Sequence, residues 1–191
     1  MSVIKDSIQT SLEIKQRILN DDKLIKTAED VAKVITKSYR NGKKTLWCGN
    51  GGSAADAQHL ATELSGKFYI ERDPLSSEAL HVNTSYLTAV ANDYSYDVVF
   101  SRLIKAQGKK GDVLVGISTS GNSKNVICAL EEARRLGMVT IGFTGEKKGK
   151  IDKLCDYLIK IPSSQTPRIQ ECHILIGHAI CEIVERNLFH N

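Results

Sequence analysis

Two segments rich in glycine and hydroxyl side chains could hold an anionic ligand. The first, Cys48–Ser53 (CGNGGS), lies between an expected strand and an expected helix. Glycines there let a ligand approach the backbone, and a helix N-terminus favours negative charge. The second, Gly116–Ser123 (GISTSGNS), places four hydroxyls at a similar junction. Hydroxyls and free helix N–H groups complement the oxygens of a phosphate without a lysine. We therefore expect a phosphate to bind at the second segment.

Neither segment is a good nucleotide-binding motif. The first can be read as the dinucleotide fingerprint Gly49-x-Gly51-x-x-Ala54, but the next expected strand ends in Asn83 instead of the acidic residue that holds a ribose. The second contains no Gly-Lys-Ser/Thr, so nucleoside triphosphate hydrolysis is not expected. The structural alternatives are a glycine turn without a ligand and a serine that only caps a helix.

A histidine and a carboxylate follow the first segment on an expected helix. His59 and Glu63 are four residues apart, so they share one helix face and can meet at one metal ion or one substrate atom. Such a pair is more often a surface hydrogen bond or salt bridge. Its position a few turns beyond the glycines favours a functional role.

Two more polar side chains of interest lie on the last expected helix. Gln170 and His178 are eight residues apart and lie within roughly 80° of each other around a helix, so they could reach the same site. His173 points roughly 140° away from His178 and fits a histidine buried in the core.

Alternating strands and helices must position these residues. After Asn41, short apolar runs alternate with helical periodicity, which indicates a parallel sheet with helices on both faces. The expected strands are Thr45–Cys48, Ala79–Val82, Val113–Ile117, Val139–Phe143 and Tyr157–Ile161. The expected helices are Ser53–Leu64, Ser85–Val90, Val98–Ala106, Ser123–Leu136 and a last one from Pro167 through Glu185.

The first forty residues predict two amphipathic helices that have no sheet of their own. Their stripes are Ile4, Ile8, Leu12 and Ile18, then Leu24, Ala28, Val31 and Ile35. Together with the last helix, they present more apolar surface than one five-stranded layer can cover. We expect them to pack against other copies of the chain. The alternative is that they fold back onto their own sheet.

Composition limits the partners and the location. The chain has 191 residues, of which 41% are hydrophobic, so one domain is expected. Its 26 basic and 22 acidic residues are spread along the sequence, which argues against a nucleic-acid or membrane partner and suits a small anionic substrate. We see no membrane span or signal peptide, and five cysteines without a CxxC pair fit reduced core residues, so a cytoplasmic protein is expected.

Four motifs, taken together and in order, resemble the phosphoheptose isomerase family of SIS-domain proteins. They are GNGGSAADAQH, AND, GISTSGNS and RIQECH with a later histidine, and the resemblance covers nearly the whole chain. It implies a single SIS domain over residues 1–191, with an N-terminal helical arm (1–41) followed by a five-stranded parallel α/β sheet and a final helix (42–191). It also implies a homotetramer.

The resemblance further implies an activity and its residues. The family interconverts sedoheptulose 7-phosphate and D-glycero-D-manno-heptose 7-phosphate through an ene-diol, in heptose precursor biosynthesis. Glu63 and His178 match its proton-transfer pair. The positions that match its zinc ligands are His59, Glu63, Gln170 and His178. The positions that match its substrate-binding residues are Asn50, Gly51, Gly52, Ser53, Glu63, Asn92, Asp93, Ser118, Thr119, Ser120, Ser123 and Gln170.

The chain departs from the family pattern at several positions that bear on the sugar contacts. Lys67 stands where an arginine is common, which removes a forked donor. His81 and Asn83 replace residues of a Thr-Thr-Asp-Thr-Ser segment, and Ala91 and Ser95 stand where glycines are common.

Two other functions are compatible with this architecture. One is a non-catalytic binding protein similar to a bacterial replication-initiation regulator, a relative that lacks the catalytic glutamate and the final histidine. Since Glu63 and His178 are present here, the enzyme is favoured. The other is an isomerase of a different ketose phosphate.

Overall fold

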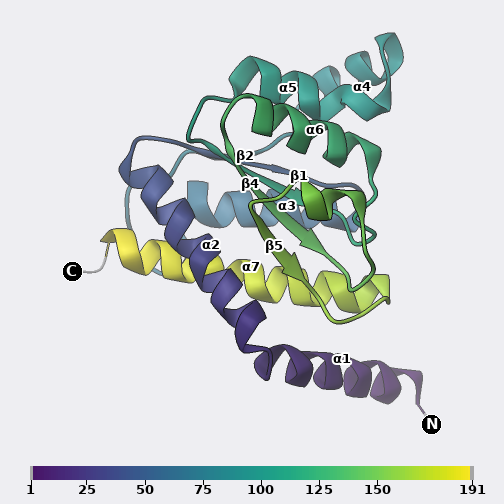
Figure 1. The fold of residues 1–191 in the computed structure, drawn as a ribbon. Coiled ribbons are helices and arrows are strands. Elements are labelled where there is room, and N and C mark those ends of the chain that lie inside the picture. The colour runs from purple at the N-terminus through teal and green to yellow at the C-terminus, as the bar shows by residue number, and fades with distance from the viewer. Residues whose placement is uncertain (1, 190–191) are drawn as a thin grey trace.

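The structure, a computed structural model, describes residues 2–189 and confirms the α/β fold (Figure 1). Five parallel strands form one sheet in the order β2-β1-β3-β4-β5. The strands are β1 (Thr45–Cys48), β2 (Ser77–Ala79), β3 (Val113–Ile117), β4 (Val139–Thr144) and β5 (Tyr157–Lys160).

Four strands match the prediction to within one residue at each end, and the second strand was predicted wrongly. We expected the second strand at Ala79–Val82, whereas β2 ends at Ala79. The chain turns there, because the N–H of Val82 bonds back to the carbonyl of Ala79. The strand begins earlier because Ser77 pairs with Thr45 of β1, and their hydroxyls are 2.8 Å apart. An apolar run alone could not reveal this polar start.

The strand order creates a crevice at the carboxyl ends of β1 and β3. The chain crosses from β1 to β2 on one side of this pair of strands, and from β3 to β4 on the other side. Ligands of open parallel sheets bind at such a point. Cys48 is paired with Gly116, so the two segments singled out in the sequence leave the sheet side by side.

Helices cover both faces of the sheet (Figure 1). Alternate side chains such as Trp47 and Leu46 enter the two separate cores, because successive residues of a strand point to opposite faces. One face is covered by α2 (Asp22–Arg40), α3 (Gly52–Ser65) and α7 (Thr166–Phe189). The other is covered by α4 (Thr84–Asp93), α5 (Val99–Gln107) and α6 (Lys124–Arg135), with short 3-10 turns η1 (Tyr96–Val98) and η2 (Lys150–Lys153).

The first helix, α1 (Val3–Leu19), extends away from the layered body (Figure 1). It is tied to the start of α7, where Arg168 donates to the carbonyl of Ser7 (2.6 Å) and Ser11 donates to Glu171 (2.9 Å). Only part of its apolar stripe is covered, since Ile8 is 55% exposed. The expected packing of this arm against other copies stays a prediction.

No helix in residues 2–189 is long and apolar enough to cross a membrane. The cytoplasmic location expected from the sequence stays a prediction.

Candidate functional site

Three serine side chains meet in the loop that follows β3, which we call the hydroxyl loop (Ser118–Ser123). The hydroxyl of Ser118 lies 2.9 Å from that of Ser123 and 3.5 Å from that of Ser120. Ser123 precedes α6, yet its side chain does not cap that helix. The loop turns at Gly121, whose φ of +65° favours glycine. Clustered hydroxyls before an uncapped helix could bind an anion, and Thr119 lies half-buried in the same loop.

The loop after β1 is joined to the first turn of α6, just after the hydroxyl loop, by a pair of amides. Asn50 donates to Asn125 (2.9 Å) and accepts from it in return (2.8 Å), while the hydroxyl of Tyr96 also donates to Asn50 (3.1 Å). Our sequence reasoning missed Asn125 and Tyr96. An amide side chain two residues after GISTSGNS was the available signal for Asn125, which the structure shows to be 4% exposed.

The glycine turn (Gly49–Gly52) makes room for its neighbours. Gly51 has a φ of +54°, and a Cβ on Gly52 would lie 2.4 Å from the amide nitrogen of Gln170. Gln170 therefore reaches from α7 to the start of α3, and its substrate-binding role stays a prediction. Ser53 is buried in the first turn of α3.

Asn92 and Asp93 lie exposed at the end of α4, where Asn92 donates to Asp93 (2.9 Å). Tyr96, a few residues further on, is the closest link from this segment to the glycine turn. Among the hydrogen bonds of the described residues, none joins Asn92 or Asp93 directly to the hydroxyl loop. Their substrate-binding role stays a prediction.

A second polar centre, which we call the His–Glu–His cluster, joins α3 to α7. The Nε2 atom of His59 lies 2.9 Å from Glu63 and 3.0 Å from the Nε2 atom of His178. The two helices approach closely because α7 has a glycine here: a Cβ on Gly177 would lie 2.4 Å from Leu60. A hollow of about 480 Å³ opens beside the cluster, lined by Ala55, Gln58, His59, Thr62 and Glu63.

The cluster could hold a metal ion. One donor atom from each of its three residues lies within 4.8 Å of the others. Tetrahedral zinc holds nitrogen and oxygen ligands at about 2.0–2.2 Å, which separates neighbouring donors by roughly 3.4 Å, so the spacing fits. Gln170, the fourth ligand implied by the sequence, lies roughly 12 Å away from His178 along α7 and contacts the glycine turn instead.

His173 is a core residue, as expected. It is fully buried, and its Nε2 atom lies 3.2 Å from the carbonyl oxygen of Thr144. Burial lowers its pKa to about 4, although the hydrogen bond to Thr144 opposes that change. The neutral ring is therefore the form that this site holds near neutral pH.

Two of the residues that depart from the family pattern make contacts in the structure. Lys67 is exposed and pairs with Glu71 (2.8 Å). The Nε2 atom of His81 lies 3.3 Å from Gln58, which lines the hollow beside the cluster, and burial lowers the pKa of His81. His81 thus contacts a side chain that lines the same hollow as His59 and Glu63.

Comparison with known proteins first defines the class. A sequence model of the SIS domain family matches residues 9–145, which include the glycine turn and the hydroxyl loop. The chain is a SIS-domain protein.

Closer relatives define the family within that class. The chain is 52% identical to the phosphoheptose isomerase of Aneurinibacillus thermoaerophilus, over 98% of this chain and 95% of the relative. It is also 52% identical to phosphoheptose isomerase 2 of Campylobacter jejuni, over 98% and 94%. The solved phosphoheptose isomerase of Neisseria gonorrhoeae superimposes with a TM-score of 0.89 at 43% identity, over 95% of this chain and 96% of that one. The chain therefore belongs to the phosphoheptose isomerase family.

Proposed function

We propose that the chain converts sedoheptulose 7-phosphate into D-glycero-D-manno-heptose 7-phosphate, a step of heptose precursor biosynthesis. The observation that carries the proposal is the meeting of Glu63 and His178, from two helices, beside an open hollow. Full-length similarity to named phosphoheptose isomerases supports it.

The pair suits the chemistry of an aldose–ketose isomerisation. The reaction moves a proton between adjacent carbons, which requires a base at carbon and an acid at oxygen. The carboxylate of Glu63 takes the proton from one carbon and returns it to the next. The imidazole of His178 has one nitrogen that can donate a proton and one that can accept a proton, so it protonates the carbonyl oxygen and later accepts a proton from the neighbouring hydroxyl.

The hydroxyl loop and glycine turn bind the unreactive end of the substrate. The phosphate contacts the hydroxyls of Ser118, Thr119, Ser120 and Ser123, while Asn50 and Gln170 contact the sugar.

We infer that the His–Glu–His cluster holds one zinc ion. Zinc would supply a positive charge that polarises the substrate oxygens and stabilises the negative charge of the ene-diolate. His59 holds its place at the cluster through Glu63 and His178. Ligation by Gln170 stays a prediction, since its amide lies at the glycine turn.

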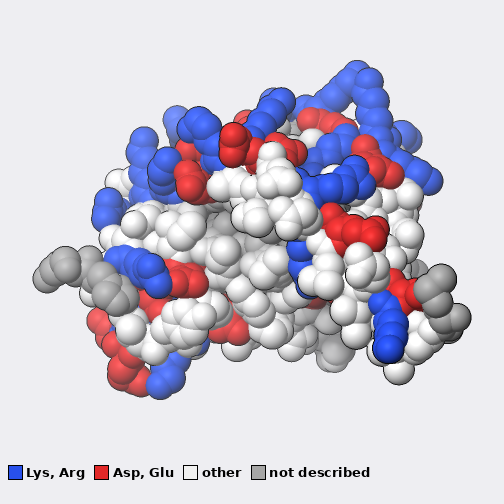
Figure 2. Space-filling model, turned by 90° about the horizontal axis from the view of Figure 1, so that it is seen from below, with Lys and Arg blue, Asp and Glu red and all other residues white. Residues whose placement is uncertain are grey.

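We infer that the active form is a homotetramer whose sites are completed across subunit boundaries. Figure 2 shows the molecule from below, and on this face a broad band of uncharged residues is flanked by charged ones. Exposed apolar residues of α1 and α7 include Ile4, Ile8, Leu12 and Leu175.

Charged substitutions at Ile8 and Leu12 test this assembly. They should dissociate the tetramer and lower turnover together, which light scattering alongside the isomerase assay would detect. A fully active monomer would contradict this assembly.

Chromatographic identification of the product tests the function itself. Purified enzyme is supplied with sedoheptulose 7-phosphate and, separately, with fructose 6-phosphate. We expect the heptose 7-phosphate from the first and little conversion of the second. Preference for fructose 6-phosphate would assign the chain to another ketose phosphate. Phosphosugar binding without turnover would favour the non-catalytic alternative.

A further inference from the structure

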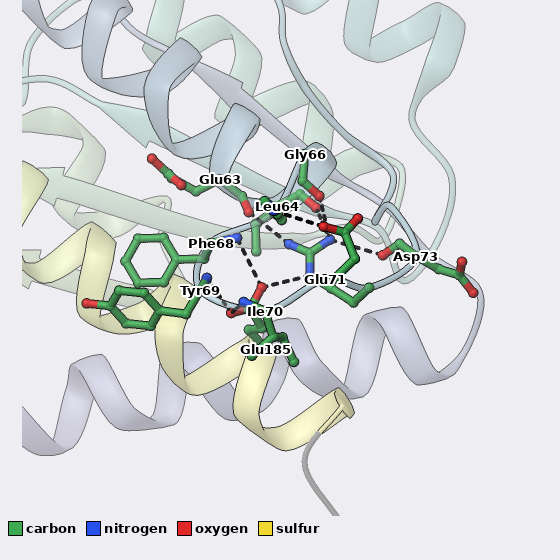
Figure 3. A network of polar contacts seen from close by, with 11 residues as sticks. Glu63, Leu64, Gly66, Phe68, Tyr69, Ile70, Glu71, Asp73 and Glu185 are labelled. Atoms are coloured by element: carbon green, nitrogen blue, oxygen red, sulfur yellow. Dashed lines mark hydrogen bonds and ion pairs between the residues drawn. The ribbon is translucent and has the colours of Figure 1, made fainter.

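A buried ion pair lies just beyond the end of α3. Arg72 and Glu185 are joined by a hydrogen bond of 2.9 Å between Nε and Oε1, and both side chains are only 2% exposed. Arg72 belongs to the segment between α3 and β2, and Glu185 belongs to α7. Figure 3 shows the polar contacts that converge on this pair. Nothing in the proposed chemistry uses either residue.

Arg72 holds the last turn of α3. Its guanidinium donates to the carbonyl oxygens of Glu63, Leu64 and Gly66, each at 2.9 Å. The final carbonyls of a helix have no partner within the helix, and a cation at that end complements the helix dipole. One side chain therefore fixes the backbone of Glu63 and the turn that follows it.

Glu185 holds the segment that follows α3. Its carboxylate accepts hydrogen bonds from three successive backbone N–H groups, those of Phe68 (3.0 Å), Tyr69 (2.8 Å) and Ile70 (3.3 Å). Burial by itself raises the pKa of Glu185, but these bonds and Arg72 outweigh burial and hold that pKa below its ordinary value. The group is thus a charged anchor with its oxygens satisfied.

The same pair connects the two helices that carry Glu63 and His178. Glu185 lies seven residues beyond His178, about two turns along α7 on nearly the same face. Phe68, held by Glu185, places its ring 5.7 Å from the ring of His178. Arg72 and Glu185, which we call the tether, therefore bind the backbone of Glu63 and the backbone of Phe68, although neither belongs to the cluster.

We propose that Arg72 and Glu185 are positioning residues for the isomerisation, which fix the separation of Glu63 and His178 by binding the end of α3 to α7. This assignment rests on the proposed function of that pair. Proton transfer requires geometry that is held to a fraction of an ångström, and a misplacement of about 1 Å can reduce a rate about 100-fold. The phosphate site at the other end of α3 does not depend on the tether.

The chain offers a matched control for a test by substitution. Asp112 is also a carboxylate that is 2% exposed, and it accepts hydrogen bonds from the side chain of Lys44 (2.6 Å) and the backbone of Lys109 (2.9 Å). It precedes β3, at the end of the sheet opposite to the site. Glu185→Gln and Asp112→Asn therefore make the same chemical change in similar surroundings.

We expect both variants to melt at lower temperatures than the wild type. Glu185→Gln should lower kcat about 10-fold to 100-fold with a KM within about 3-fold of wild type, because only the reacting geometry is disturbed. Asp112→Asn should keep kcat within about 2-fold. Wild-type kcat in Glu185→Gln, or an equal loss of kcat in Asp112→Asn, would overturn the assignment.

Arg72→Lys provides a second test if Glu185→Gln does not fold. Lysine keeps the positive charge beside Glu185 but cannot reach the three carbonyls together. We expect a folded enzyme whose kcat falls about 10-fold. A folded Arg72→Lys enzyme with wild-type kcat would overturn the positioning role of Arg72 and Glu185 but leave the proposed function intact. A wild-type chain without turnover of sedoheptulose 7-phosphate would instead overturn the proposed function, and the assignment with it.

Discussion

The hydroxyl loop and the His–Glu–His cluster are held by different means. The hydroxyl loop is a single short segment at the end of a fully buried strand, and its geometry comes from the backbone turn at Gly121. The cluster combines residues more than one hundred positions apart, on two helices outside the sheet. A binding site made of consecutive residues tolerates distant changes, whereas a reacting pair on separate helices depends on whatever keeps those helices together.

The largest expected effect is at the cluster. Glu63→Gln preserves the shape of the side chain but removes the proton acceptor, so turnover should fall by about 10²–10⁴. Affinity for inorganic phosphate, measured by isothermal titration, should stay the same because the hydroxyl loop is intact. The control is Glu71→Gln, which changes an exposed glutamate that pairs with Lys67. Normal turnover in Glu63→Gln would show that Glu63 is not the base.

At the hydroxyl loop the effect should fall on affinity. Ser120→Ala combined with Ser123→Ala removes two donors to the phosphate, and affinity for inorganic phosphate should fall about 10-fold to 100-fold. Some loss of turnover would follow, since binding energy from a remote group also serves the reacting end. Unchanged affinity in the titration would place the phosphate elsewhere.

A smaller effect is expected where the glycine turn meets the first turn of α6. Asn125→Ala removes the amide that pairs with Asn50, so the sugar contact loses its fixed orientation and KM should rise about 10-fold. Tyr96→Phe removes only one hydrogen bond to Asn50 and should raise KM less. Steady-state kinetics of the two variants show which of them has the larger rise in KM. A larger change in Tyr96→Phe would contradict this account of the amide pair.

The smallest effect on turnover is expected at His173, which affects stability in acid. Its pKa is lowered to about 4 in the fold, so between pH 6.5 and 4 the unfolded chain binds a proton that the folded chain does not. Stability should therefore fall as the pH is lowered through this range, by about 3 kcal/mol at most. His173→Gln does not titrate and should weaken this pH dependence in thermal melts. An unchanged dependence would assign it to other groups.

The sequence was most informative about local features. The two loops at strand-to-helix junctions, the parallel sheet and the core location of His173 were predicted, because glycine turns, buried strands and helical periodicity are properties of neighbouring residues. The i, i+4 pair His59 and Glu63 was found for the same reason.

Features that depend on distant pairing were harder to predict. The polar start of β2 at Ser77 follows from its neighbour β1. Asn125 and Tyr96 could not be connected to Asn50 without the strand order that brings β1 beside β3. The axial separation of Gln170 and His178, roughly 12 Å, follows from their spacing on a helix, but the closeness of Gln170 to Gly52 could not be predicted from the sequence.

In chain order α7 follows all five strands, which has a consequence for synthesis on the ribosome. Its 24 residues cover one face of the sheet with side chains such as Ile176 and Ile180, and they also bring His178 to the site. Until they leave the exit tunnel, the nascent chain exposes the apolar face that they later cover, in a form open to aggregation or chaperone binding. Completion of the His–Glu–His cluster and protection of the core therefore depend on the same helix, which is synthesised after the sheet.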